Sequence, residues 1–209
     1  METEDLLMRR LLASGSGVFY WLGVIIQARR VRRHIGRSPN LNPRGTKEKL
    51  LWFGWMLVVL SWIAGPFLCG PDTQVAAAKP VISLILPAGL VMGTLLLIAG
   101  YAGTQWCYRV MGDAWRIGVN RKEKTFLVTN GPYRLVRHPI YSFQLVMISG
   151  ICLLLPAPVF TAVLVLHLVC VNLKAQDEES YLAGVHGDSY TEYVKTTGRL
   201  VPRFAREKV

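Results

Sequence analysis

The sequence predicts an all-α integral membrane protein with about five transmembrane helices. Of its 209 residues, 52% are hydrophobic and 18% are charged, whereas a soluble domain carries about 25% charge. The apolar residues are clustered, because residues 50–69 and 80–108 contain no charged side chain. Runs of this length suit the roughly 30 Å hydrocarbon core of a bilayer. The net charge of +11 lies in the loops between apolar runs, which indicates anionic lipid headgroups and argues against a nucleic-acid partner.

The first predicted span covers residues 11–28. Its Gly-Ser-Gly sequence resembles the start of a nucleotide-binding loop, but no strand precedes it and Tyr20 occupies the position of the third glycine. Small residues that allow close helix packing are the better interpretation. No cleavable signal peptide is evident in the acidic and then basic start of the chain, METEDLLMRR.

Loop charge sets the predicted orientation of the next spans. Residues 29–49 contain eight Lys or Arg and one Glu, which is typical of a cytoplasmic loop and places the N-terminus outside. The second span is 50–69, and the third begins at Pro80 and ends near Tyr101. Residues 109–138 are again basic and predicted to be cytoplasmic.

The last two spans form a predicted helical hairpin. One span begins at Pro139, the other covers residues 158–174, and only Pro156 and Ala157 join them. The tail, residues 174–209, is therefore cytoplasmic. We divide the chain into N-terminal spans (1–108) and a C-terminal cofactor-binding region (109–209).

The four cysteines give no sign of a metal site. Cys69, Cys107, Cys152 and Cys170 form no CxxC pair, and no histidine lies at metal-ligand spacing from them. We interpret them as small apolar packing residues.

The segment NGPYRLVRHPIY (130–141) leads a basic loop into an apolar helix. Pro139 is suited to the first helical position, so free backbone N–H groups and the positive end of the helix dipole face the cytoplasm there. Arg134, Arg137 and His138 are near the same point, which predicts a site for a carboxylate or phosphate. Binding of lipid headgroups by the arginines is the alternative.

Two further segments follow the last span. In KAQDEESY (174–181), acids at a cytoplasmic helix C-terminus oppose the helix dipole, which suggests a partner such as a cationic ligand. The alternative is a solvated helix end, with Lys174 and Glu178 paired across one turn. In residues 187–204, the spacing of Tyr190 and Tyr193 favours packing over binding.

Together, these segments resemble one enzyme family. GDAWRIGV (112–119), FLVTNGPYRLVRHPIY (126–141), DEESYLAGVHGDSYTEY (177–193) and RLVPRF (199–204) are similar to the isoprenylcysteine carboxyl methyltransferase family. That family lies within a wider group of membrane methyltransferases that includes phospholipid methyltransferases. The resemblance implies S-adenosylmethionine as methyl donor, a lipophilic or prenylated acceptor and an active site on the cytoplasmic face.

The resemblance also implies a set of cofactor-binding residues, namely Thr125, Phe126, Leu127, Val128, Tyr133, His138, Pro139, Ile140, Tyr141 and Glu178. By spacing from the acidic cluster, the family arginine associated with the substrate carboxylate corresponds to Lys174. Lysine keeps the charge but lacks the bidentate guanidinium. Arg199 is a second candidate for this catalytic role.

Carboxyl O-methylation of an isoprenylcysteine-like substrate is the function that these residues indicate, with no metal and no covalent nucleophile required. Methylation of a phospholipid amine or a small thiol by the same fold is a second hypothesis. The sequence is also compatible with a membrane reductase of the sterol type that uses NADPH, and with a non-catalytic lipid-binding protein.

Overall fold

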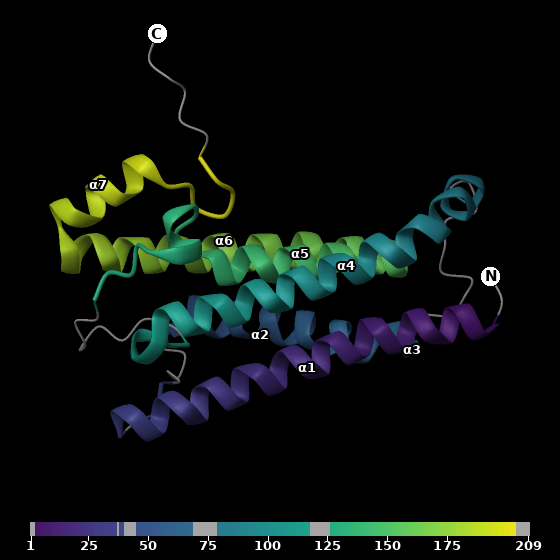
Figure 1. Ribbon diagram of the computed structural model, residues 1–209, viewed down its shortest axis with the longest axis horizontal. Coiled ribbons are helices and arrows are strands. Elements are labelled where there is room, and N and C mark those ends of the chain that lie inside the picture. Colours follow the sequence, from purple (N-terminus) through teal and green to yellow (C-terminus); the bar gives the residue numbers. More distant parts are fainter. Residues whose placement is uncertain (1–2, 37, 40–44, 69–78, 118–125, 204–209) are drawn as a thin grey trace, which may run out of the picture.

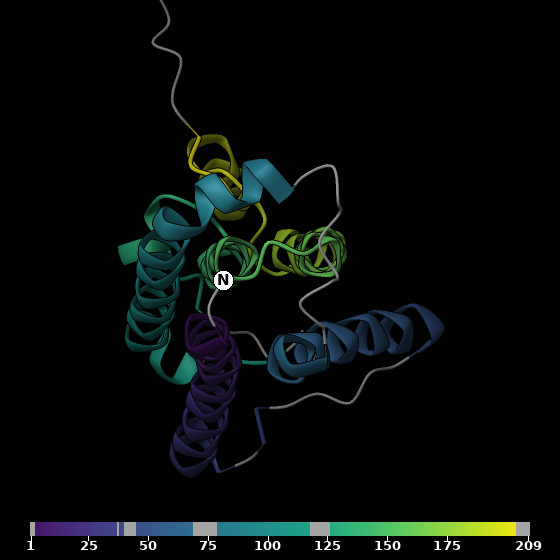
Figure 2. The same cartoon turned by 90° about the vertical axis from the view of Figure 1, so that its right-hand side faces the viewer.

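The computed structural model describes residues 3–36, 38–39, 45–68, 79–117 and 126–203 (Figure 1). Helices that run along one common direction form a bundle, seen end-on in Figure 2. Its long members are α1 (Thr3–Ile35), α2 (Gly45–Ile63), α4 (Lys79–Met111), α5 (Pro139–Leu154) and α6 (Pro158–His186). Within the described ranges there is no β-strand, and Val136 and Gly198 form an isolated bridge. The predicted all-α class is confirmed.

Among the described residues, three helices are long and apolar enough to cross a membrane: Glu4–Ile35, Pro87–Ala114 and Pro158–His186. They contain the predicted first and fifth spans and most of the third. Helix α5 is apolar but has only 16 residues, and α2 begins with the charged side chains of Lys47 to Lys49. An integral membrane protein is therefore supported, whereas a count of five spans stays a prediction.

Helices α1 and α2 pack through the small residues of the Gly-Ser-Gly segment. A Cβ atom at Gly17 would lie 2.9 Å from Cδ1 of Trp62, so only glycine allows this approach. Trp62 Nε1 donates a hydrogen bond to Ser16 Oγ at 3.0 Å, and Ser14 Oγ donates to the Ile63 carbonyl oxygen at 2.7 Å. Helix packing is thus the correct interpretation of this segment.

The position of α5 is fixed by a close backbone approach to α4. A Cβ atom at Gly93 would lie 2.7 Å from the Gly150 carbonyl oxygen, and the reverse distance is also 2.7 Å. Small residues on both helices are therefore needed for this contact. The buried side chains of Met147, Ile151 and Leu154 complete this face of α5.

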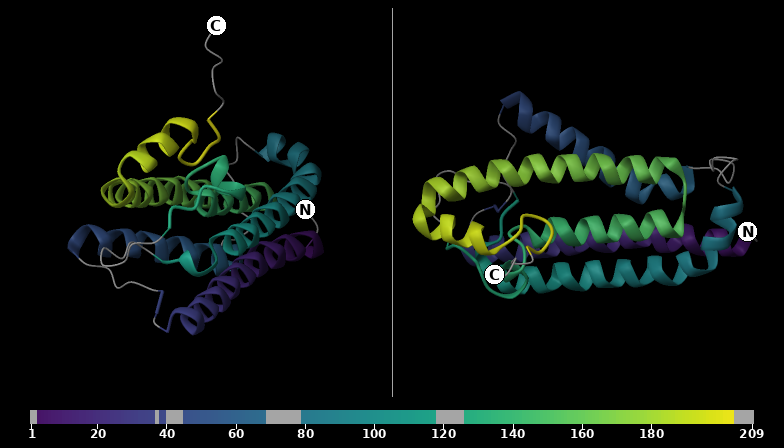
Figure 3. Two further views of the ribbon diagram at one scale, coloured as in Figure 1. Left: turned by 60° about the vertical axis from the view of Figure 1, so that its left-hand side comes forward. Right: turned by 90° about the horizontal axis from the view of Figure 1, so that it is seen from above.

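The described parts of the segments predicted to be cytoplasmic gather at one end of the bundle. The C-terminal end of α1, η3 (Gly112–Ala114), η4 (Gly131–Arg134) and α7 (Asp188–Thr196) lie there, opposite the N-terminus and α3 (Gly65–Leu68) (Figures 1 and 3). His34 Nδ1 lies 3.0 Å from Asp113 Oδ1 and joins two of these segments. The side of the membrane that this end faces stays a prediction.

Helix α6 is longer than the span predicted at 158–174. It continues through the acidic cluster to His186 and ends at Gly187, whose φ of 53° turns the chain into α7. Cys107 and Cys170 are buried free thiols and Cys152 is a half-buried one, whereas Cys69 lies outside the described residues.

Candidate functional site

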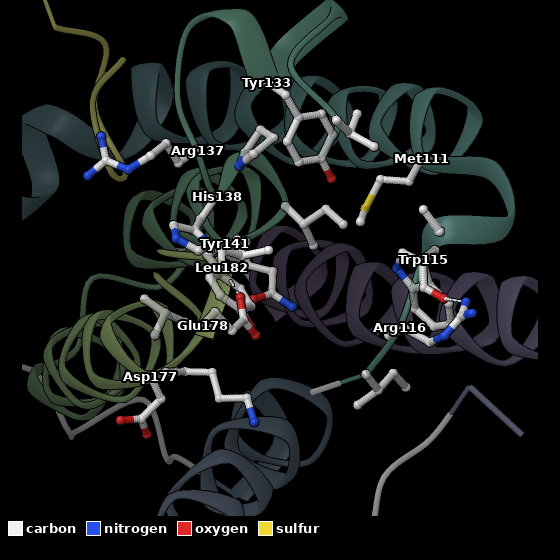
Figure 4. A pocket seen from close by; sticks show the side chains of 18 of the residues that line it. Met111, Trp115, Arg116, Tyr133, Arg137, His138, Tyr141, Asp177, Glu178 and Leu182 are labelled. Carbon is white, nitrogen blue, oxygen red and sulfur yellow. Dashed lines mark hydrogen bonds and ion pairs between the residues drawn. The ribbon is translucent and has the colours of Figure 1, made fainter. Parts of the chain in front are cut away.

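A cavity of about 460 Å³ lies at the end of the bundle that holds η4 and α7 (Figure 4). It is lined by side chains from α1, α2, α4, α5, α6 and α7 and from the turns η3 and η4. Residues far apart in the sequence therefore line one pocket. The labelled side chains of His138, Tyr141 and Glu178 lie together on one side of it, and Trp115 and Arg116 lie on the other.

The turn η4 places the start of α5 beside this cavity. Gly131 has a φ of 57°, and a Cβ atom there would lie 2.9 Å from Cγ2 of Val110. The next two residues, Pro132 and Tyr133, are buried, and the Tyr193 hydroxyl donates a hydrogen bond of 2.5 Å to the Tyr133 carbonyl oxygen. The Gly-Pro-Tyr sequence thus supports a rigid turn that presents α5 to the cavity.

Glu178 is the carboxylate that faces the cavity beside the first turn of α5. The Tyr141 hydroxyl donates a hydrogen bond of 2.7 Å to Glu178 Oε1, and His138 Nδ1 lies 3.2 Å from Glu178 Oε2. The His138 and Tyr141 rings stack with centroids 5.7 Å apart. Two neighbouring helices therefore hold this carboxylate in a defined orientation while 20% of its side chain stays exposed.

His138 lies between two carboxylates. Its Nε2 is 3.3 Å from Glu179 Oε1, and its Nδ1 faces Glu178. Burial alone lowers the pKa of His138, but the two carboxylates outweigh burial and raise this pKa above its usual value. The protonated imidazolium is therefore favoured at this point.

Two arginines hold Glu179 on the other side of His138. Arg137 Nε lies 2.9 Å from Glu179 Oε1, and Arg199 Nη2 lies 2.7 Å from Glu179 Oε2. Arg199 also donates a hydrogen bond to Asn172 Oδ1 at 3.1 Å. Both guanidinium groups are engaged within the protein. Of the three residues predicted to form an anion site, Arg137 and His138 line the cavity, and anion binding there stays a prediction. Arg134 is exposed and does not line the cavity.

Hydrogen bonds hold the C-terminal segment after α7 against the start of α5. The backbone N–H groups of Arg137 and His138 donate to the carbonyl oxygens of Gly198 and Arg199, at 2.8 and 3.1 Å. Ser142 Oγ donates to the Leu200 carbonyl oxygen at 2.6 Å. Since these bonds bring the RLVPRF segment to the RHPIY segment, the two motifs form one structural unit.

Asp177 and Lys174, the other charged residues of this segment that line the cavity, differ in their partners. Asp177 Oδ1 accepts a hydrogen bond of 2.6 Å from Lys47 Nζ on α2. Lys174 lines the cavity and has no hydrogen bond or ion pair to another residue in the described ranges. The hypothesis that pairs Lys174 with Glu178 across one helical turn is therefore not supported. The rings of Tyr190 and Tyr193 are 6.1 Å apart, and they both pack together and line the cavity.

The cavity brings together almost all of the residues that the resemblance implied. Those that line it are Phe126, Leu127, Val128, Tyr133, His138, Pro139, Ile140, Tyr141, Lys174 and Glu178. Thr125 lies outside the described residues. Arg199 does not line the cavity and is paired with Glu179.

Several lining residues were not expected from the sequence. They are Tyr20, Trp52, Trp55, Trp115 and Gln144, from four different helices or turns. Gln144 follows Tyr141 by three residues, so helical periodicity places both on one face of α5 and could have identified it. Trp115 lies in the GDAWRIGV segment, which could have indicated it. Tyr20, Trp52 and Trp55 depend on how distant helices pack, for which the sequence carries no local signal.

Comparison with known proteins supports one enzyme class. Residues 88–189 match the family model described as phospholipid methyltransferase, which covers just under half of the chain. The matched region includes most of α4 and all of η4, α5 and α6. It confirms the predicted resemblance to the wider group of membrane methyltransferases and supports a membrane methyltransferase.

Two curated proteins are also similar. The cobalt-zinc-cadmium resistance protein CzcN of Cupriavidus metallidurans is 28% identical over 122 residues, covering 58% of this chain and 52% of that protein. The nickel-cobalt-cadmium resistance protein NccN of Alcaligenes xylosoxydans xylosoxydans is 25% identical over 134 residues, covering 64% and 54%. The chain thus spans about half the length of the curated relatives it matches.

Proposed function

We propose that this membrane methyltransferase uses S-adenosylmethionine to methylate a lipophilic acceptor at the cytoplasmic face. The observation that carries the proposal is the orientation of Glu178 by Tyr141 and His138 beside a cavity of about 460 Å³. A fixed carboxylate at such a place suits a cationic ligand.

The lining residues fit the three chemical parts of the cofactor. Glu178 suits the ammonium group. The first turn of α5 has backbone N–H groups at Ile140 and Tyr141 without intrahelical partners, which suit the carboxylate. Leu127 and Val128, with the buried ring of Tyr133, supply a wall for the adenine.

When bound, S-adenosylmethionine supplies an electrophilic methyl group on a sulfonium ion. The protein therefore needs mainly to position the acceptor and exclude water. Burial raises the pKa of Tyr133 well above its usual value, so this phenol remains neutral at pH 7. A carboxylate acceptor requires no general base.

Lys174 supports a carboxylate acceptor such as a prenylcysteine. Its ammonium group has no partner in the described ranges, and it lies on the cavity wall one helical turn from Glu178. An ionised acceptor carboxylate would be oriented and partly neutralised there. The choice of a carboxylate acceptor over an amine acceptor is therefore part of this proposal.

A phospholipid amine is the second candidate. Trp52 and Trp55 line the α2 side of the cavity with ring centroids 5.8 Å apart, and Glu48 lines it nearby. Aromatic faces next to a carboxylate favour an ammonium group. The description of the matched family agrees with this chemistry.

Transfer of a labelled methyl group from S-adenosylmethionine tests both candidates in purified protein. N-acetyl-S-farnesylcysteine serves as the carboxylate acceptor and phosphatidylethanolamine as the amine acceptor. Label in a base-labile methyl ester supports the carboxylate proposal, and label in the lipid amine supports the second candidate. Absence of both products and of cofactor binding would contradict the proposed function.

A further inference from the structure

One buried polar group at the cavity has an unmatched hydrogen-bonding atom. Gln144 on α5 is only 2% exposed and lines the cavity. Its Nε2 donates a hydrogen bond of 2.5 Å to the Tyr20 hydroxyl on α1, but its Oε1 has no partner among the described residues. An unpaired amide oxygen in a buried, apolar setting is costly, which calls for an explanation.

The amide is also held in a fixed position. The Tyr20 ring stacks on Trp62, with centroids 5.4 Å apart and planes inclined by 24°. Trp62 is itself hydrogen-bonded to Ser16 Oγ. If the two ends of the amide were exchanged, its oxygen would accept from Tyr20 and its nitrogen would be unpaired, so one end stays available in either case.

We infer that the free end of Gln144 binds a neutral hydrogen-bonding group of the ligand within the cavity. With its nitrogen bonded to Tyr20, the amide presents its oxygen, which accepts a hydrogen bond from an N–H or O–H group. This inference rests on the proposed function. Beside the ionic contacts of Glu178 and Lys174, it adds a residue that hydrogen-bonds a neutral polar group of the ligand. An N–H or O–H of the cofactor's adenosine and a polar group of the acceptor are the two possible sources.

The ordinary explanation is that Gln144 only ties α5 to α1 through Tyr20. The two interpretations differ in the ligand-free protein. If the amide serves a ligand, Gln144→Leu leaves stability equal or improved, because an unpaired buried atom is removed and the Tyr20 hydroxyl keeps Tyr108 as a partner. If it serves the fold, Gln144→Leu is less stable and ligand binding is unchanged.

The test measures S-adenosylhomocysteine affinity by calorimetry, methyl transfer to N-acetyl-S-farnesylcysteine or phosphatidylethanolamine, and thermal unfolding without ligand. Gln144→Leu is compared with Met147→Leu, a change of similar size at a buried α5 residue that does not line the cavity. A loss of about two- to tenfold in S-adenosylhomocysteine affinity assigns Gln144 to the cofactor. A comparable rise in acceptor KM with unchanged cofactor affinity assigns it to the acceptor.

Unchanged affinity and unchanged KM in Gln144→Leu overturn the inference even if the enzyme is active. If the wild-type protein binds no S-adenosylhomocysteine, the proposed function fails. The unfolding measurement then decides Gln144 separately, because a destabilised Gln144→Leu protein identifies a structural amide and overturns the inference, whereas equal or higher stability supports it.

Discussion

Replacing Glu178 with glutamine removes the negative charge proposed to bind the cofactor ammonium while keeping the size of the side chain. The Tyr141 hydroxyl can still donate to the amide oxygen at the position of Glu178 Oε1, so the local packing is preserved. The substitution also removes the negative charge that faces His138 Nδ1 at 3.2 Å, so loss of cofactor affinity in Glu178→Gln tests charge in a side chain of the same size.

The magnitude follows from the exposure of this carboxylate. A hydrogen bond to a charged group contributes about 1.5–3 kcal/mol, and the 20% exposure of the Glu178 side chain favours the lower half of that range. The dissociation constant of S-adenosylmethionine should rise about 10- to 30-fold. The same rise is expected for S-adenosylhomocysteine, which has the same ammonium group.

Isothermal titration calorimetry on purified protein measures this change. Methylthioadenosine lacks the amino-acid part of the cofactor, so its affinity should be the same in the wild type and in Glu178→Gln. Glu192→Gln on α7 is a matched control, because Glu192 is 70% exposed and pairs only with Lys195 in the described ranges. An affinity for S-adenosylmethionine within twofold of wild type in Glu178→Gln would refute the assignment of Glu178.

Three more substitutions test the remaining residues of the site. Lys174→Ala should raise the KM for a carboxylate acceptor about tenfold with cofactor affinity intact, measured by labelled-methyl transfer; an unchanged KM would favour an amine acceptor. Arg199→Ala should lower the unfolding temperature and leave acceptor KM unchanged, because Arg199 pairs with Glu179; a raised KM would instead support a catalytic role. Because the pKa of His138 is raised in the folded protein, its protonation stabilises the fold below about pH 6.5, and this gain is lost as pH rises. In His138→Gln, the unfolding temperature should therefore fall less steeply above about pH 6.5 than in the wild type. Equal slopes would exclude this coupling.

Much of the fold could be predicted because its signals are local. Uncharged runs and basic loops mark α1, α4 and α6 without reference to any distant residue. The length of α6 was predicted less well, because hydropathy ends at residue 174 while helical hydrogen bonding continues to His186. Ion pairs from Asp177 to Lys47 and from Glu179 to Arg137 and Arg199 join those turns to other parts of the chain.

The candidate site was predictable where one short segment carries it. The RHPIY segment and Glu178 lie together as the resemblance implied, since both line the cavity. The role of Arg199 was harder to predict, because a guanidinium within reach of a ligand and one paired with Glu179 have the same sequence context. Gln144 and Tyr20 meet only through the packing of α5 against α1.

The three consecutive acids of α6 show why the role of each residue in such a cluster is hard to assign from sequence alone. Successive helical residues point about 100° apart, so neighbours face different surroundings. Asp177 also lines the cavity but pairs with Lys47 on α2, whereas Glu179 pairs with two arginines near the C-terminal segment. Glu178 instead accepts a hydrogen bond from Tyr141, faces His138 and lies on the cavity wall. Neutralising Glu178 should therefore affect ligand binding, whereas neutralising Glu179 should loosen the contact between α5, α6 and the C-terminal segment.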